Sequence, residues 1–155
     1  MKHKKLFLAF VLLSILLWPL CARLWNGGSQ GLEIKDIPYL EAKNYFYSGG
    51  AGRLADPKIC TDAQFDSLFD TASHLDESNQ PTPVDFSRQF VIAVVLPVTN
   101  RNQSVRLGRL AERGSQLVLS YKLLNGPVSS RKIRPVALVL VDRRYVSHDI
   151  TLVEE

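Results

Sequence analysis

The sequence has little of what metal and cofactor chemistry requires. Its 155 residues contain only two cysteines, Cys21 and Cys60, with no CxxC pair and no cysteine–histidine spacing typical of zinc. Three glycines, Gly49, Gly50 and Gly52, follow no strand-to-helix phosphate-binding pattern. We therefore predict that the protein holds no metal and no cofactor.

A strong excess of one charge is also missing from the part expected to fold. The whole chain carries a formal charge of +4, but Lys2, Lys4 and Lys5 precede the first apolar run. From Arg23 onward there are 16 basic and 15 acidic side chains, a net charge of +1. A nucleic-acid-binding domain needs a clear basic excess, so we predict no nucleic-acid partner.

A catalytic residue set is absent as well. Ser147, His148 and Asp149 are adjacent, and neighbouring side chains of an extended segment point to opposite faces, so they do not predict a catalytic relay. His74 lies in a polar loop. Cys60 precedes an expected helix start, where a thiolate is stabilised, but no base is indicated nearby. We predict no catalytic residue and a chain that is not an enzyme.

The N-terminus carries an export pattern. MKHKK is followed by the 15 uncharged residues LFLAFVLLSILLWPL, and a basic start before an apolar run of about 7–15 residues is typical of a secretory signal. The uncharged run reaches 17 residues at Ala22, below the roughly 20 of a typical membrane span. We expect residues 1–22 to be a signal or anchor and residues 23–36 a Gly- and Ser-containing flexible tether.

Three fates of Cys21 stay open: lipid attachment, retention in an uncleaved anchor, and cleavage after Ala22. Trp18, Pro19 and Leu20 form a poor lipidation box, and Leu20 is also unsuited to ordinary cleavage. Each fate places the domain outside the inner membrane, in the cell envelope, with membrane attachment favoured. A Gly-rich tether indicates a region that does not pack against the domain, so we predict no Cys21–Cys60 disulfide.

Residues 37–155 are expected to form one domain. A strand is predicted over Lys43–Tyr47, and a helix from Thr61, where T-D-A-Q is a capping box. Its apolar stripe is Phe65, Leu68, Phe69 and Ala72. Asp85 is expected to cap the turn before the next strand, with Phe86 in the core beneath the helix.

Later strands follow with short connections. Phe90–Val98 and Val136–Val141 are apolar throughout, which is typical of strands buried on both faces. Turns are expected at Thr99–Gln103 and Asn125–Pro127, a bulge at Gly108, and a short last strand at Ile150 and Leu152. The predicted class is α+β, a mainly antiparallel sheet of about five or six strands with one helix packed on one face.

Two basic stretches suggest a binding surface. One stretch contains Arg101, Arg106, Arg109 and Arg113, and the other contains Arg131, Lys132, Arg134, Arg143 and Arg144. Ordinary solvated edges would account for them, but aligned strands would gather them for an acidic partner or lipid head groups. The predicted partner surface consists of Arg101, Arg106, Arg109, Arg113, Arg131 and Arg134.

The order of segments resembles the C-terminal domain of the PrcB protease-complex-subunit family. The likeness lies in FDSLF, a polar loop, PVDFSRQFVIAVVL and the Pro-led strand RPVALVLVD; IPYLEAKNYF is also similar to uncharacterised Bacteroides-type envelope proteins. The family's Gly-Gly-Tyr segment is replaced here by TNRNQSVRLG. The resemblance implies a non-enzymatic, exported accessory module acting on another envelope protein. A structural or small-ligand-binding envelope protein is the alternative, and a small hydrolase or redox enzyme using Cys60 or His148 comes last.

Overall fold

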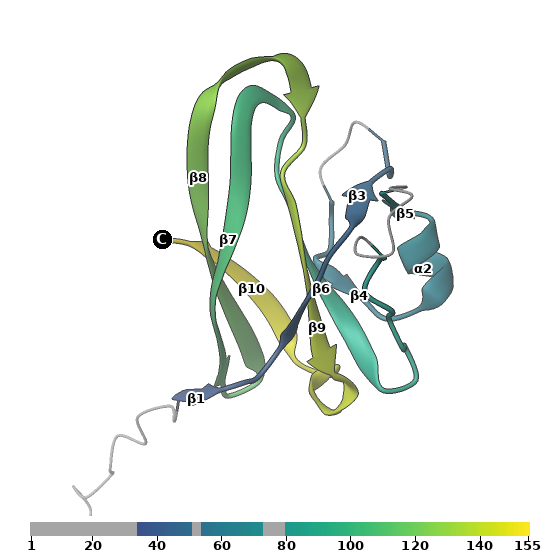
Figure 1. The fold of residues 1–155 in the computed structure, drawn as a ribbon. Coiled ribbons are helices and arrows are strands. Elements are labelled where there is room, and N and C mark those ends of the chain that lie inside the picture. Colours follow the sequence, from purple (N-terminus) through teal and green to yellow (C-terminus); the bar gives the residue numbers. More distant parts are fainter. Residues whose placement is uncertain (1–33, 51–53, 73–79) are drawn as a thin grey trace, which may run out of the picture. The chain divides into compact units, whose positions relative to one another are not determined.

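The computed structural model describes residues 34–50, 54–72 and 80–155 (Figure 1). The predicted signal segment, Cys21 and His74 lie outside these residues. No helix in the described ranges is long and apolar enough to span a membrane. β1 (Ile34–Asp36) is the first described strand, so pairing begins inside the span predicted as tether.

The outer sheet has the order β1-β7-β8-β10. Its two long strands, β7 (Thr99–Arg113) and β8 (Gln116–Ile133), form an antiparallel hairpin that turns at Gly114, whose φ is +60°. β10 (Asp149–Glu154) pairs in parallel with Gln116–Tyr121 of β8. Figure 1 shows β7 and β8 running past their neighbours and bending over at the upper end toward β6 and β9.

The central sheet has the order β2-β9-β6-β4 and is antiparallel. It contains β2 (Leu40–Ala42), β4 (Lys58–Ile59), β6 (Gln89–Val95) and β9 (Val136–Asp142). Phe90, Ile92 and Val94 face the outer sheet, whereas Val91 and Ala93 face the other way. Both faces of β6 and β9 are buried, as their apolar runs predicted, but the strand predicted over Phe90–Val98 ends at Val95, and Pro97 and Val98 are exposed.

A third layer covers the far face of the central sheet. It contains β3 (Tyr45–Tyr47), β5 (Phe69–Thr71) and the five-residue helix α2 (Asp62–Asp66). Phe65 and Phe69 stack with ring centroids 5.2 Å apart, and Phe86 lies beside Phe65. The burial of Phe86 beneath the helix is therefore as predicted.

The predicted α+β class is wrong. The described chain is a β-rich sandwich of three sheets with one short α-helix, not one sheet covered by a helix. Its apolar residues form two clusters, one on each side of the central sheet. The physical reason is that β6 and β9 carry apolar side chains on both faces of the central sheet, so two further layers are needed to cover them.

The predicted helix is correct at its start and wrong in its length. The Thr61 hydroxyl accepts a hydrogen bond from the Gln64 amide, as an N-cap should, but the Gln64 side chain accepts from the Cys60 amide. The helix ends at Asp66, and Phe69 pairs with Tyr47 across two strands. Phe65 and Phe69 of the predicted stripe are buried, whereas Leu68 and Ala72 are only partly buried. Pairing of Phe69–Thr71 with β3 replaces further helical turns.

Two predicted turns are bulges within long strands. The hairpin register shifts between Thr99 and Gln103, and Gly126 lies so close to Asn102 that an added Cβ would be 2.3 Å from the Asn102 carbonyl oxygen. The bulge predicted at Gly108 is confirmed by a register shift between Leu107 and Leu110. Bulges let these strands bend between sheets without a chain reversal.

Candidate interaction surface

The β7–β8 ribbon is the part of the hairpin, Thr99–Gly108 and Lys122–Ile133, with which no third strand of the described residues pairs. β1 pairs with β7 only from Ala111 to Arg113, and β10 pairs with β8 only as far as Tyr121. The ribbon therefore presents main-chain edges that no described strand pairs with, while Val105 and Leu107 on one of its faces pack against the apolar cluster between the outer and central sheets.

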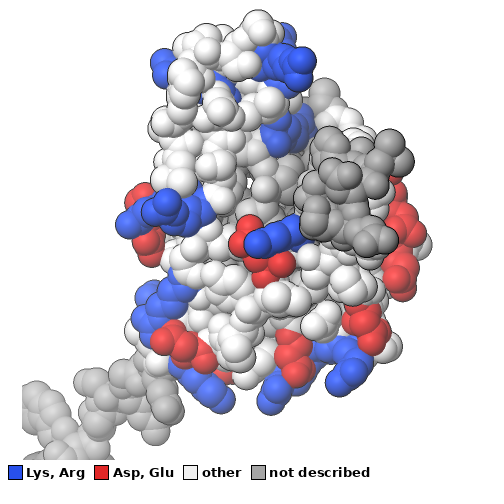
Figure 2. All heavy atoms as spheres, in the orientation of Figure 1, with Lys and Arg blue, Asp and Glu red and all other residues white. Residues whose placement is uncertain are grey.

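Cations without ion-pair partners gather on this ribbon. Arg101, Arg106, Arg131 and Lys132 are exposed, and none forms an ion pair with any described residue. Between Asp85 and Asp142 the sequence contains nine basic residues and a single acidic one, Glu112. Figure 2 shows Lys and Arg, and no Asp or Glu, over the upper end of the visible face.

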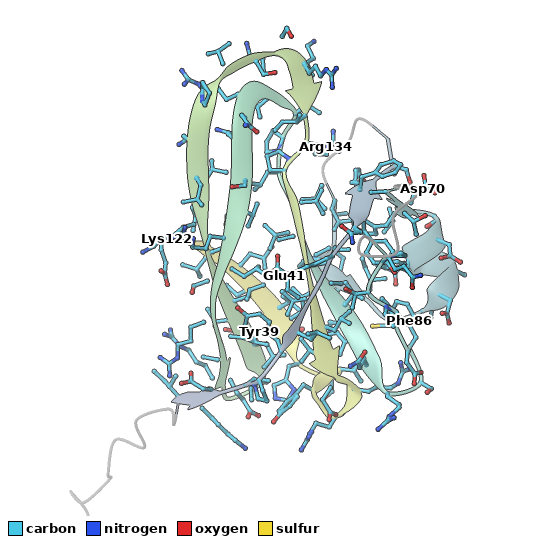
Figure 3. The ribbon with its side chains drawn as sticks, in the orientation of Figure 1. Tyr39, Glu41, Asp70, Phe86, Lys122 and Arg134 are labelled. Carbon is cyan, nitrogen blue, oxygen red and sulfur yellow. The ribbon has the colours of Figure 1, made fainter. Side chains whose placement is uncertain are left out.

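Two of the ribbon cations oppose each other directly. Arg106 on β7 is the register partner of Lys122 on β8, and like charges placed opposite across two strands are destabilising. Lys122 has a weak ion pair with Glu155 at 3.6 Å, with both side chains about half exposed. Figure 3 shows Lys122 projecting away from the ribbon. The ribbon thus keeps a repulsion that an external anion would relieve.

Apolar side chains accompany this charge. Val128 is 63% exposed within β8, and Val98 is 50% exposed just before β7. Both lie in the stretch that bends between the sheets. The surface therefore combines cations with aliphatic contacts, which suits a protein surface better than a bare phosphate.

The structure brings together only part of the predicted partner surface. Arg101, Arg106 and Arg131 lie on the ribbon, but Arg109 pairs with Asp36. Arg134 donates to the Gly50 carbonyl at 3.0 Å and stacks over the Tyr47 ring, pointing toward the third layer (Figure 3). Arg113 lies at the far end of β7, opposite Ile34. Lys122 also lies on the ribbon but is not part of the predicted partner surface. The absence of Asp and Glu from the sequence around it is the signal that could have indicated it.

His148 belongs to a structural contact. Its Nε2 lies 3.0 Å from Glu112 Oε1 and its Nδ1 lies 3.2 Å from the Tyr145 carbonyl. Lys58 Nζ donates to the carbonyls of Val146 and His148 at 3.1 and 2.7 Å. These bonds join the β9–β10 connection to both large sheets. In the described chain, no nucleophilic side chain is hydrogen-bonded to this ring.

Cys60 is a free, half-buried thiol just ahead of α2. Its carbonyl accepts from Arg143 Nη1 at 3.4 Å, and Arg143 also donates to the Phe86 carbonyl. Arg143 therefore fastens the start of α2 to the end of β9. Among the described residues, no group of three or more potential metal ligands is present.

The aromatic segment at Tyr45 and Tyr47 lies over the second apolar cluster. Tyr45 meets Phe65 edge to face at 5.1 Å and donates from its hydroxyl to the Thr82 carbonyl, and burial raises its pKa, with Asp66 adding to the rise. Tyr47 packs on Phe69 at 5.6 Å. These rings hold the third layer on the central sheet.

A shallow hollow of about 460 Å³ lies beside β2 and contains Asp85, Arg88 and Asp142. Hydrogen bonds from Ser87 lower the pKa of the Asp85 carboxyl, and those from Arg144 lower the pKa of Asp142. Both carboxylates are thus already paired with protein donors, and the charge of Arg88 also lowers the pKa of both.

The chain matches no protein-family model, no curated protein and no solved structure.

Proposed function

We propose that this protein is an exported, membrane-attached binding module that docks through the β7–β8 ribbon on an acidic surface of another envelope protein. The observation that supports this proposal is that Arg101, Arg106, Arg131 and Lys132 form no ion pair with a described residue, on strand segments that contain no Asp or Glu. Protein partners recognise such patches by complementary charge, which raises association rates and selects orientation.

The ribbon lies far from the point where the described chain begins. Ile34, where the described chain begins, pairs with Arg113, whereas Arg101 lies 12 residues away along β7. At about 3.3 Å per residue this separation is roughly 40 Å along the strand.

A non-enzymatic role fits the surroundings of His148. Both ring nitrogens are occupied by contacts that fix the β9–β10 connection, and a general base needs one nitrogen directed at a reacting group. An accessory role in a protease complex, as the family resemblance implies, is one form of this proposal.

The test is site-specific photocrosslinking in the native host, with a crosslinker at Val128 of the full-length chain. We expect one discrete adduct with an envelope protein, lost in the variant Arg101→Glu, Arg131→Glu, Lys132→Glu. The matched control reverses three exposed cations elsewhere, Lys35→Glu, Arg88→Glu and Arg113→Glu. An adduct equally abundant in both triple variants would refute the proposal.

A further inference from the structure

The outer edge of β10 is a second interaction surface, separate from the ribbon. β10 is an edge strand of the outer sheet, and no described strand pairs with its other side. The Asp149 amide donates to the carbonyl of Ser115, in the turn before β8, at 3.0 Å, and the Glu155 amide donates to the Tyr121 carbonyl of β8 at 2.9 Å. Because main-chain groups of a strand alternate in direction, those of Ile150, Leu152 and Glu154 point to the open side.

A cavity lies directly behind this edge, between the two large sheets. It has a volume of about 440 Å³ and is lined by Pro57, Ala93–Leu96, Tyr121 and Leu152, together with Leu54 and Ala55. Tyr121 is the one polar side chain among these lining residues, and the other side chains are aliphatic or proline.

The central sheet is also short on this side. β4 covers β6 only at Val91 and Ile92, and the Pro57 carbonyl accepts from the Ala93 amide. Beyond Ala93 no described strand lies beside β6 here. An open strand edge and a hollow lined mainly by aliphatic side chains behind it are the two elements of strand-addition binding, in which main-chain bonds give affinity and side-chain pockets give specificity.

The charge of this edge is opposite to that of the ribbon. Asp149 and Glu154 are exposed at the two ends of β10, and neither forms an ion pair with a described residue. They are five residues apart, about 17 Å along an extended chain. Complementary charge therefore requires basic side chains near both ends of the occupant.

We propose that an extended segment of a partner protein adds to β10 as a strand, places one aliphatic side chain in the cavity behind Leu152, and carries Lys or Arg toward Asp149 and Glu154. This site does not depend on the ribbon, so charge reversal at Arg101, Arg131 and Lys132 leaves it unchanged.

The probe is a seven-residue peptide with arginine at positions one and six and with leucine and valine alternating with threonine between them. Titrated into the full-length chain, it should bind with a Kd at or below about 1 mM. Amide chemical-shift changes should be confined to β10 and the cavity wall. N-methylation of the peptide amides on one edge should weaken binding about five- to tenfold per bond lost, and N-methylation on the other edge should have no effect.

Two protein variants complete the test. Glu154→Pro removes an outward N–H while keeping the ladder to β8, and Glu154→Ala keeps that N–H but loses the charge. Ala55→Phe fills the cavity. We expect Glu154→Pro and Ala55→Phe to lose peptide binding, and Glu154→Ala to weaken it. No binding at millimolar peptide, equal effects of both N-methylation patterns, or a self-associated chain dissociated by Glu154→Pro would overturn the proposal.

Discussion

Phe65 and Phe69 show how single side chains hold the third layer on the central sheet. Both rings are at least 95% buried in the same apolar cluster. Phe65→Ala and Phe69→Ala should each lower the free energy of unfolding by about 3–5 kcal/mol, from a typical total of about 5–15 kcal/mol. Urea unfolding measures the loss. Phe46→Ala, at a 49% exposed neighbour, is the control, and losses below about 1 kcal/mol at both buried positions would contradict this packing.

The contact between His148 and Glu112 should be cooperative. Their side chains are only 16% and 25% exposed. Removal of one side chain therefore leaves the other without its partner at a position with little access to water. We expect His148→Ala and Glu112→Ala each to cost about 1–3 kcal/mol, with a coupling of about 1 kcal/mol in the double-mutant cycle. Strictly additive losses would show that the two side chains act independently.

Asp85 and Asp142 should make stability fall in acid. Hydrogen bonds lower the pKa of both carboxyls below their ordinary 3.8 in the folded chain. A lowered folded pKa adds stability above pH 4, and this contribution is lost as pH falls through the folded value. The midpoint temperature of thermal unfolding should therefore fall less steeply between pH 5 and pH 2 for Asp85→Asn and Asp142→Asn than for the parent chain. Asp149→Asn, whose side chain accepts no bond from a described residue, is the control.

Among the elements, local sequence patterns predicted β6 and β9 of the central sheet, but they failed where pairing with a distant segment decides the structure. Val91–Val94 are apolar on both faces, so their burial follows from the sequence alone. The spacing of Phe65, Leu68 and Phe69 also fits a helix, but β3 competes for Phe69–Thr71, and a pattern does not show which segment becomes a neighbour. Asn125–Pro127 resembles a turn because the same residues also suit a bulge.

Gly126 tests the bulge that lets the ribbon bend. A methyl group there would collide with the Asn102 carbonyl oxygen, and overpacking of this kind costs about 1–3 kcal/mol. We expect Gly126→Ala to speed amide exchange in Thr99–Gln103 and Asn125–Ile133 while Phe90–Val95 stays protected. Ser130→Ala, an exposed change in the same strand, is the matched control. Uniform loss of protection in every sheet would show that the ribbon and the sandwich unfold as one unit.

The candidate site was predictable only in part, for a reason of register. The sequence indicates which segments are basic, but not that Arg106 faces Lys122, or that Arg109 meets Asp36 from a strand 73 positions earlier. Which cations lack partners depends on these long-range contacts. The open edge of β10 leaves no local signal, because a strand is exposed only through the absence of a neighbour.

For the whole molecule, the state of Cys21 can be measured directly. We expect attachment either through a lipid on Cys21 or through the uncut apolar segment, with no bridge to Cys60. Intact mass under non-reducing conditions distinguishes them, as an acyl increment on a chain starting at Cys21 or as a full-length chain. A soluble chain beginning at Arg23, or a mass two hydrogens short, would contradict the prediction.

The pairing of the first strands has a consequence for timing. Ile34 finds its partner 79 positions later at Arg113, and Leu40 finds its partner 100 positions later at Leu140. At about 5–20 residues per second, a ribosome needs roughly 5–20 s to supply those last 100 residues. Throughout that interval both edges of the sandwich are incomplete. Because β1 and β2 pair this late, the two large sheets stay incomplete during synthesis. An export channel that passes only unfolded chains can accept the chain before these sheets form.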